Sequence, residues 1–277
     1  IEDSELVVID QSNEKTGSLA KIVEYSTLEG ITGKNINVSA YRETGSLVGN
    51  ITGAIVKDTH VIGVSVSGTS RVGAIAGYVD KSQMMECSAN GETSATEAAV
   101  GGFIGYVNKS SIINCFSNAK AEGNAGIASF VGQTHNKSTL RNNLTLANQF
   151  KGYKFDGRTA VDKFDNFSGN YENDGNAGTS TRDRVTSISL DGKINIASVA
   201  DVETESFYTN TLGWDEEIWD FSKVSTGGIP KLKNSDQNDN SSAAATYHIK
   251  SADEFIAKIT SDPYGRFILD NDVDFSS

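Results

Sequence analysis

Short apolar phrases bounded by glycine recur along the first half of the chain at a fixed distance. Four begin at positions 17, 45, 73 and 101, so their spacing is constant, and a weaker fifth begins at Ala128, one residue short of that spacing. Within each unit, hydrophobic and polar residues alternate over short runs broken by turn residues, which is typical of strands. Glycine at both ends of a five-residue phrase is incompatible with the long runs that a helical repeat needs. The pattern therefore predicts a repeat protein built from strands.

Aligning the units in register indicates how they stack. Val56 falls on Met84 and Ile112, and Ile36 falls on Val64. Three short strands and three turns fit one rung of about 28 residues, and neighbouring rungs would lie about 4.8 Å apart. We therefore predict an all-β fold, a single-stranded, right-handed parallel β-helix in which equivalent residues form ladders along the inside of the coil.

The repeated glycines and both cysteines are predicted to be structural. Cys87 and Cys115 are separated by exactly one period, so they should lie in adjacent rungs on one ladder. That placement suits a pair of buried reduced thiols and also a disulfide, whose dihedral angle is not guaranteed by side chains that point the same way. Glycine permits tight corners and close approach between backbones. The glycines concerned are Gly45, Gly49, Gly73, Gly77, Gly101 and Gly105.

The repeat weakens after the fifth copy. Residues 1–142 hold the repeats, and residues 143–232 are predicted to continue the coil irregularly and then cap it. A short helix is expected over 202–211, terminated by Gly213. The aromatic residues that follow are expected to form a hydrophobic plug over the open end of the coil, as terminal repeats require.

The C-terminal region predicts a change of domain. Residues 233–246 have the polar composition of a linker. Residues 247–277 predict a strand, a helix opened by a capping box at Ser251, and a second strand, a short α/β element that would begin a second module. Because the chain starts and stops within such patterns, we expect it to be a piece of a longer protein.

Charge and hydropathy exclude two classes of partner. The chain carries 24 basic and 36 acidic residues, a net charge of −12. A nucleic-acid-binding protein needs a basic surface to displace counterions, so we expect no nucleic-acid partner. No segment approaches the roughly 20 apolar residues of a membrane span, so no membrane insertion is expected. The acidity favours a soluble secreted or surface protein.

The usual catalytic constellations are not found in the sequence. The three histidines, His60, His135 and His248, are isolated, and no Cys-x-x-Cys motif is present. Asp58 and Glu86 align on one ladder, but the next member is the neutral Asn114, which weakens the case for a glycosidase pair. We therefore expect no catalytic residue, no cofactor and no metal ligand in this chain. An autonomous carbohydrate-active enzyme is the least favoured alternative.

The sequence Gly-Gly-Phe-Ile-Gly-Tyr-Val at 101–107, followed by Ile-Ile-Asn-Cys at 112–115, resembles the GLUG repeat of bacterial surface proteins. Residues 207–232 resemble the segment that often closes a GLUG array. Residues 247–275 are similar to an element of IgA1-protease-type zinc metallopeptidases of Gram-positive bacteria. The resemblance implies a secreted, cell-surface protein in which this chain is a non-catalytic scaffold that docks the substrate. The partners it implies are a host protein such as an immunoglobulin, or a glycan, and other domains of the same polypeptide.

The metallopeptidase chemistry itself would have to lie elsewhere. A peptidase of this type needs His-Glu-x-x-His, and none of the three histidines is followed by Glu. The zinc implied for the parent protein would therefore be bound outside this chain. The alternative is a fragment of an adhesin that binds a host protein or glycan with no peptidase attached.

Overall fold

The computed structural model describes the repeat region almost completely and the remainder in parts. The chain divides into two compact units, residues 1–235 and residues 236–277. Residues 174–193, most of the linker and the helix expected after Ser251 lie outside the described residues. The described residues are 6–10, 14–146, 164–168, 170–173, 194–197, 199–233, 246–249, 251 and 266–269.

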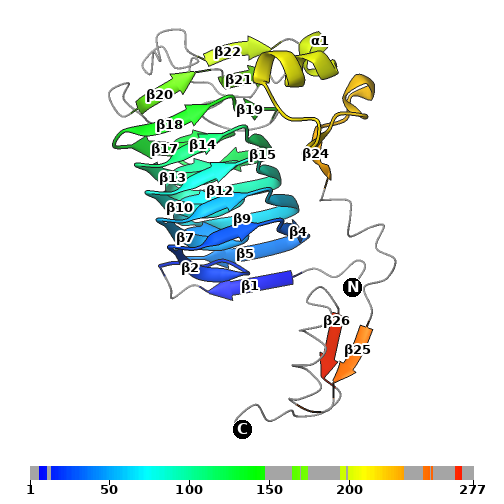
Figure 1. The fold of residues 1–277 in the computed structure, drawn as a ribbon. Helices are drawn as coiled ribbons and strands as arrows, with labels where there is room; N and C mark the ends of the chain where they lie inside the picture. Colours follow the sequence, from blue (N-terminus) through cyan, green and yellow to red (C-terminus); the bar gives the residue numbers. More distant parts are fainter. Residues whose placement is uncertain are drawn as a thin grey trace. The chain divides into compact units, whose positions relative to one another are not determined.

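The first unit contains a coil whose turns contribute strands to three parallel sheets (Figure 1). Sheet 1 contains β1 (Leu6–Asp10), β4 (Thr32–Lys34), β5 (Ile36–Ala40), β6 (Arg42–Gly45), β9 (His60–Gly73), β12 (Ser88–Gly101), β15 (Phe116–Glu122), β16 (Ala125–Ala128), β19 (Leu144–Thr145), β21 (Asn170–Asn173) and β22 (Ile194–Ala197). Sheet 2 contains β2 (Ala20–Glu24), β7 (Val48–Thr52), β10 (Ala76–Asp80), β13 (Ile104–Asn108) and β17 (Val131–His135). Sheet 3 contains β3 (Thr27–Glu29), β8 (Ile55–Lys57), β11 (Gln83–Met85), β14 (Ser111–Ile113), β18 (Ser138–Arg141) and β20 (Phe164–Ser168).

The register of the strands confirms the predicted β-solenoid and its period. Ala76 pairs with Val48 on one side and with Ile104 on the other, each one period away along the chain. Met84 pairs with Val56 and Ile112, as the alignment of the units predicted. The inward side chains form one continuous hydrophobic core with columns of like residues, and the rings of Phe103 and Phe130 stack 4.9 Å apart.

The corners between sheets repeat as strictly as the strands, and most of them do not use glycine. The residues at two corners have φ between 44° and 67°, in the left-handed region that costs an ordinary residue about 1–2 kcal/mol. Backbone hydrogen bonds between rungs offset that cost: Lys81 N–H donates to Asn108 O (3.0 Å). The two corner columns are Tyr25, Gly53, Lys81, Lys109, Lys137 and Gly30, Asp58, Glu86, Asn114, Asn142.

The repeated glycines lie where two backbones approach each other, and their φ values are not in the left-handed region. A methyl group added at Gly77 would lie 2.2 Å from the carbonyl carbon of Glu43, and one at Gly105 would lie 2.4 Å from that of Arg71. The same conflict with backbone atoms, at 1.9–2.4 Å, would arise at Gly45, Gly49, Gly73 and Gly101. Of the two roles expected for these glycines, the structure therefore shows close approach and not the corners.

Polar ladders run through the interior beside the apolar ones. The hydroxyls of Ser82, Ser110 and Ser138 each accept a hydrogen bond from a backbone N–H of the preceding rung, at 3.0–3.3 Å. In the cysteine column, the next two rungs carry Asn143 and Asn170. Asn143 Oδ1 accepts from Cys115 N–H (2.9 Å), and its Nδ2 donates to Ile112 O (2.9 Å) and to Asn170 Oδ1 (2.9 Å). The ladder thus satisfies backbone groups where the coil becomes irregular.

Replacing Asn143 with Ala should destabilise the fold. The substitution removes the side-chain partner of Cys115 N–H and of Ile112 O in a fully buried position, which should lower the unfolding free energy by about 2–4 kcal/mol. Urea denaturation measures the change. Asn118→Ala, which removes the same side chain from the outer face of β15, is the control and should change stability by less than about 0.5 kcal/mol. Equal effects from the two substitutions would contradict the ladder.

The aromatic segment packs against the flank of the coil. Phe116 and Leu144 directly follow inward-facing residues, so they point outward, and both are fully buried within the aromatic cluster. Trp214 Nε1–H donates to Asn142 O (2.9 Å), which fixes the segment to the coil. These contacts place the segment beside an outward apolar column of the coil, and the end plug stays a prediction. The cluster also contains Ala197, Val202, Phe207, Tyr208, Leu212, Trp219, Phe221, Val224 and Leu232.

The helix expected over 202–211 is replaced by two shorter segments, α1 (Val199–Val202) and the π-helical turn Phe207–Leu212. Gly213, with φ of 70°, ends the second, as predicted. The strands β23 (Trp219–Asp220) and β24 (Lys231–Leu232) then pair antiparallel beside the coil (Figure 1).

In the second unit, the two predicted strands are present as β25 (Thr246–Ile249) and β26 (Arg266–Leu269). They pair parallel to each other, with Tyr247 opposite Phe267. Among the described residues of both units, no helix is long and apolar enough to cross a membrane.

Candidate functional site

The two cysteines lie where the sequence placed them, in adjacent rungs, and both are free and fully buried. Cys87 Sγ lies 3.1 Å from Met85 O, and Cys115 Sγ lies 3.2 Å from Ile113 O. Burial, and then the neighbouring Cys87, raises the pKa of the Cys115 thiol well above its ordinary value. The structure therefore has the reduced pair rather than the disulfide. Because the thiolate is the reactive form, this pair is suited to packing and not to nucleophilic chemistry.

The three histidines lie in different parts of the fold. His60 on β9 is buried, and its Nδ1 is hydrogen-bonded to Ser88 Oγ one rung away. Desolvation, followed by the charges of Lys231 and Lys34, lowers the pKa of His60 to about 4. His135 ends β17 in sheet 2, and His248 is in β25 of the second unit. Within the described part of the chain, no three His, Cys, Asp or Glu residues are placed to hold a metal ion.

The second corner column carries two carboxylates, and one of them, Glu86, is affected by the charge of Asp215 in the aromatic segment. Asp58 and Glu86 occupy equivalent left-handed corners, as their alignment predicted, and Asn114 follows. Burial raises the pKa of Glu86, and Asp58 and Asp215 raise it further. Asp215 comes from the aromatic segment, so the one-period alignment could not have placed it there. Two of the three carboxylates at this corner therefore come from the repeat, and the fold adds the third.

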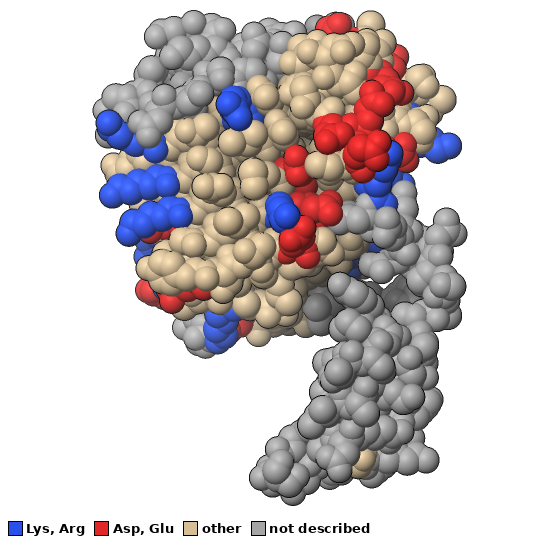
Figure 2. Space-filling view, in the orientation of Figure 1, with Lys and Arg blue, Asp and Glu red and all other residues tan. Residues whose placement is uncertain are grey.

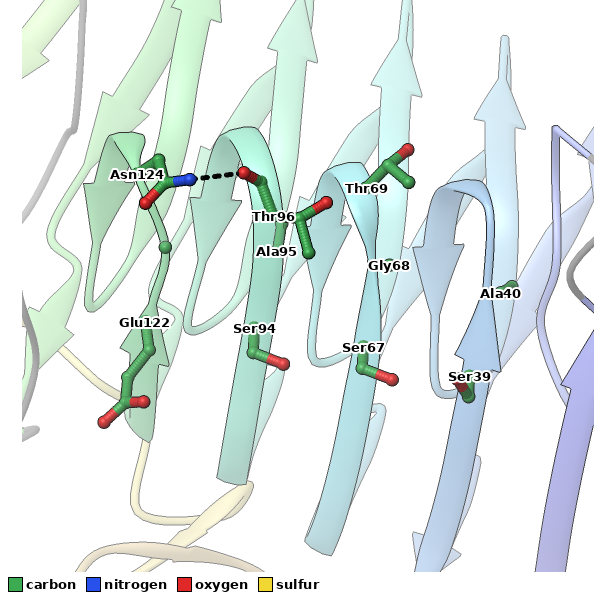
Figure 3. Close-up of a pocket in the computed structure, with 11 residues that line it drawn as sticks. Ser39, Ala40, Ser67, Gly68, Thr69, Ser94, Ala95, Thr96, Glu122 and Asn124 are labelled. Atoms are coloured by element: carbon green, nitrogen blue, oxygen red, sulfur yellow. Dashed lines mark hydrogen bonds between the residues drawn. The ribbon is translucent and has the colours of Figure 1, made fainter.

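A shallow groove of about 430 Å³ crosses the outer face of sheet 1 where its long strands bend (Figure 3). Ser39, Ser67, Ser94 and Glu122 lie in register along it, one from each rung. Small side chains leave the hollow open, and Asn124 Nδ2 donates to Thr96 O (2.5 Å) at its rim (Figure 3). Its lining, which also includes Ala40, Gly68, Thr69, Ala95 and Gly123, contains hydroxyls, an amide and one carboxylate but no histidine. Such a lining suits hydrogen bonding to an extended ligand.

The outer face of sheet 2 carries a second set of columns, which the sequence analysis did not identify. Tyr78 and Tyr106 pair in register, with ring centroids 5.3 Å apart, and both rings are partly exposed. The Arg71 guanidinium lies over both rings, 5.0 Å and 4.8 Å from their centroids. Glu43 fixes that guanidinium through an ion pair. Aligning positions 78 and 106 one period apart would have revealed the column, since tyrosine stands at both.

Comparison with known proteins gives no assignment. No protein family model, no curated protein and no solved structure matches the chain. The geometry alone gives two candidate sites on the outer faces, the groove on sheet 1 and the columns on sheet 2.

The burial of His60 predicts a specific dependence of stability on pH. The folded protein binds the His60 proton only near pH 4, whereas the unfolded chain binds it near pH 6.5. Stability from this residue is therefore complete above pH 6.5 and should fall by about 3 kcal/mol as the pH drops to 4. Urea denaturation from pH 7.5 to 4 measures this loss. The variant His60→Gln, which does not titrate, should lose less stability over the same range, and parallel curves for both proteins would contradict the prediction.

Proposed function

We propose that this chain is a non-catalytic scaffold and substrate-docking segment of a secreted, cell-surface zinc metallopeptidase of IgA1-protease type. The observation that supports the proposal is the burial of the side chains that could act as nucleophiles or bases. Cys87, Cys115 and Ser110 are buried in the interior, and each contacts a carbonyl of the preceding rung. His60 is buried on the outward column that also contains Phe116, and it bonds to Ser88 one rung away. The interior thus uses its polar groups to hold the stack together, which leaves recognition to the outside.

The outer faces suit docking because they repeat. Consecutive rungs present equivalent side chains about 4.8 Å apart on a rigid frame. Recognition commonly resides on such frames, where surface residues are positioned by a stable scaffold. The groove over Ser39, Ser67 and Ser94 offers a row of hydroxyls to an extended chain. A host protein such as an immunoglobulin, or a glycan, is the proposed partner, and zinc would be bound by another part of the parent protein.

The second candidate is an adhesin fragment that binds a host protein or glycan with no peptidase attached. The partly exposed tyrosine column of sheet 2 favours it, because such a surface functions without a catalytic domain. The open reading frame separates the two: a downstream His-Glu-x-x-His favours the peptidase, and a repeat array that ends at a wall anchor favours the adhesin.

The proposal predicts that this chain alone cleaves neither its protein partner nor a glycan. Incubating the chain alone with immunoglobulin A and with a panel of polysaccharides should give no cleavage, as measured by mass spectrometry of the products. The acidic corner provides the sharpest control, because Glu86 has the raised pKa expected of a general acid. Reproducible turnover that is abolished in Glu86→Gln would overturn the non-catalytic assignment.

A further inference from the structure

The outer face of sheet 2 is organised as three parallel columns. The first contains Asn50, Tyr78, Tyr106 and Gln133, which pair in register from strand to strand. The second, two residues further along each strand, contains Thr52, Asp80, Asn108 and His135. The third is the corner that follows, where Lys81, Lys109 and Lys137 recur once in every period.

The lysine column is a local basic strip on an acidic protein. Lys81, Lys109 and Lys137 are all exposed, and their α-carbons span about 10 Å over two rung spacings. Lys81 lies 3.9 Å from Asp80, and within the described residues no ion pair involves Lys109 or Lys137. Figure 2 shows basic side chains gathered at the left margin, on the side where β10, β13 and β17 lie in Figure 1. The strip therefore stands out against the net charge of −12.

The middle column is held in place by hydrogen bonds between rungs, one within the column and one from the neighbouring corner residue Asn136. Asn108 Nδ2 donates to Asp80 Oδ1 (2.6 Å), and Asn136 Nδ2 donates to Asn108 Oδ1 (2.9 Å). These bonds run from rung to rung, so they fix the amides in a line between the tyrosines and the lysines. Preorganised polar groups of this kind lose little conformational entropy when a ligand binds.

We propose that this face binds an acidic polysaccharide that lies along the coil axis. The lysines would contact its carboxylates or sulfates, the amides would bond its hydroxyls, and the tyrosine rings would pack against the apolar faces of its sugar rings. This inference specifies the docking role proposed above and names its ligand class. It does not depend on whether a peptidase is attached.

The combination of columns favours a glycan over an acidic peptide. An acidic peptide would need the lysines alone, whereas the tyrosine column, partly exposed and fixed by Arg71, supplies a flat apolar surface beside them. Nucleic acid is disfavoured because the strip is a single column on a protein of strongly negative charge.

The test measures binding of heparin and of polygalacturonate by isothermal titration calorimetry at 50 mM and 150 mM NaCl. It compares the parent chain with two test variants, each of which has a matched control variant. The first variant is Lys81→Asn/Lys109→Asn/Lys137→Asn, since Asn tolerates the left-handed corner. Its control, Lys57→Gln/Lys120→Gln/Lys223→Gln, removes the same charge from elsewhere on the chain. The second variant is Tyr106→Thr, and its control is Tyr41→Thr, outside sheet 2. Thermal melting confirms that each variant is folded.

The proposal expects both probes to bind more weakly at the higher salt concentration. The corner variant should lose about tenfold in affinity, as three exposed ion pairs imply, and Tyr106→Thr should lose about threefold or more. Both controls should bind like the parent chain. Absence of binding to either acidic glycan would overturn the proposal. So would equal binding of poly-L-glutamate together with no effect of Tyr106→Thr, which would indicate nonspecific attraction of polyanions. Cleavage of a probe by the parent chain would instead refute the non-catalytic assignment and leave this surface in place.

Discussion

The stacking of each rung on an equivalent rung is the constraint on which the rest of this structure depends. In a parallel coil, every inward residue meets its own counterpart one period away, so a side chain must be compatible with a copy of itself or with a close substitute. Apolar residues meet this condition by simple packing. Some polar residues meet it by bonding to the neighbouring rung, as Ser82 and Ser110 do. The glycine phrase meets it in another way, by letting two backbones approach closely.

The same constraint explains how much of the fold could be predicted. The period, the three strands per rung and the pairing of Cys87 with Cys115 all follow from repetition, which is written into the sequence. The left-handed corners at Asp58 and Glu86 were not expected, because φ is set by the path of the chain and glycine was the natural candidate. The Asn143–Asn170 ladder was not predicted either. The two asparagines are 27 residues apart, one fewer than the period, and the side chains of the column change from thiols to amides.

The packing of the aromatic segment could not have been inferred from repetition. Its place on the flank depends on Phe116 and Leu144, two outward positions that are apolar in only some rungs. The groove and the sheet 2 columns are similar in kind. No single residue of these surfaces indicates a site. The surfaces form only because the coil places equivalent residues side by side. The coil thus uses its interior side chains for stacking and arranges repeated side chains in columns on its outer faces.

Native-state hydrogen exchange measured residue by residue with NMR tests the central claim most directly, because the inter-rung hydrogen bonds are what the register predicts. The account predicts that amide protection repeats once per rung across β7, β10 and β13, with Val48, Ala76 and Ile104 equivalent. A pattern of protection with another period, or none, would contradict the stacked register and the outer columns derived from it.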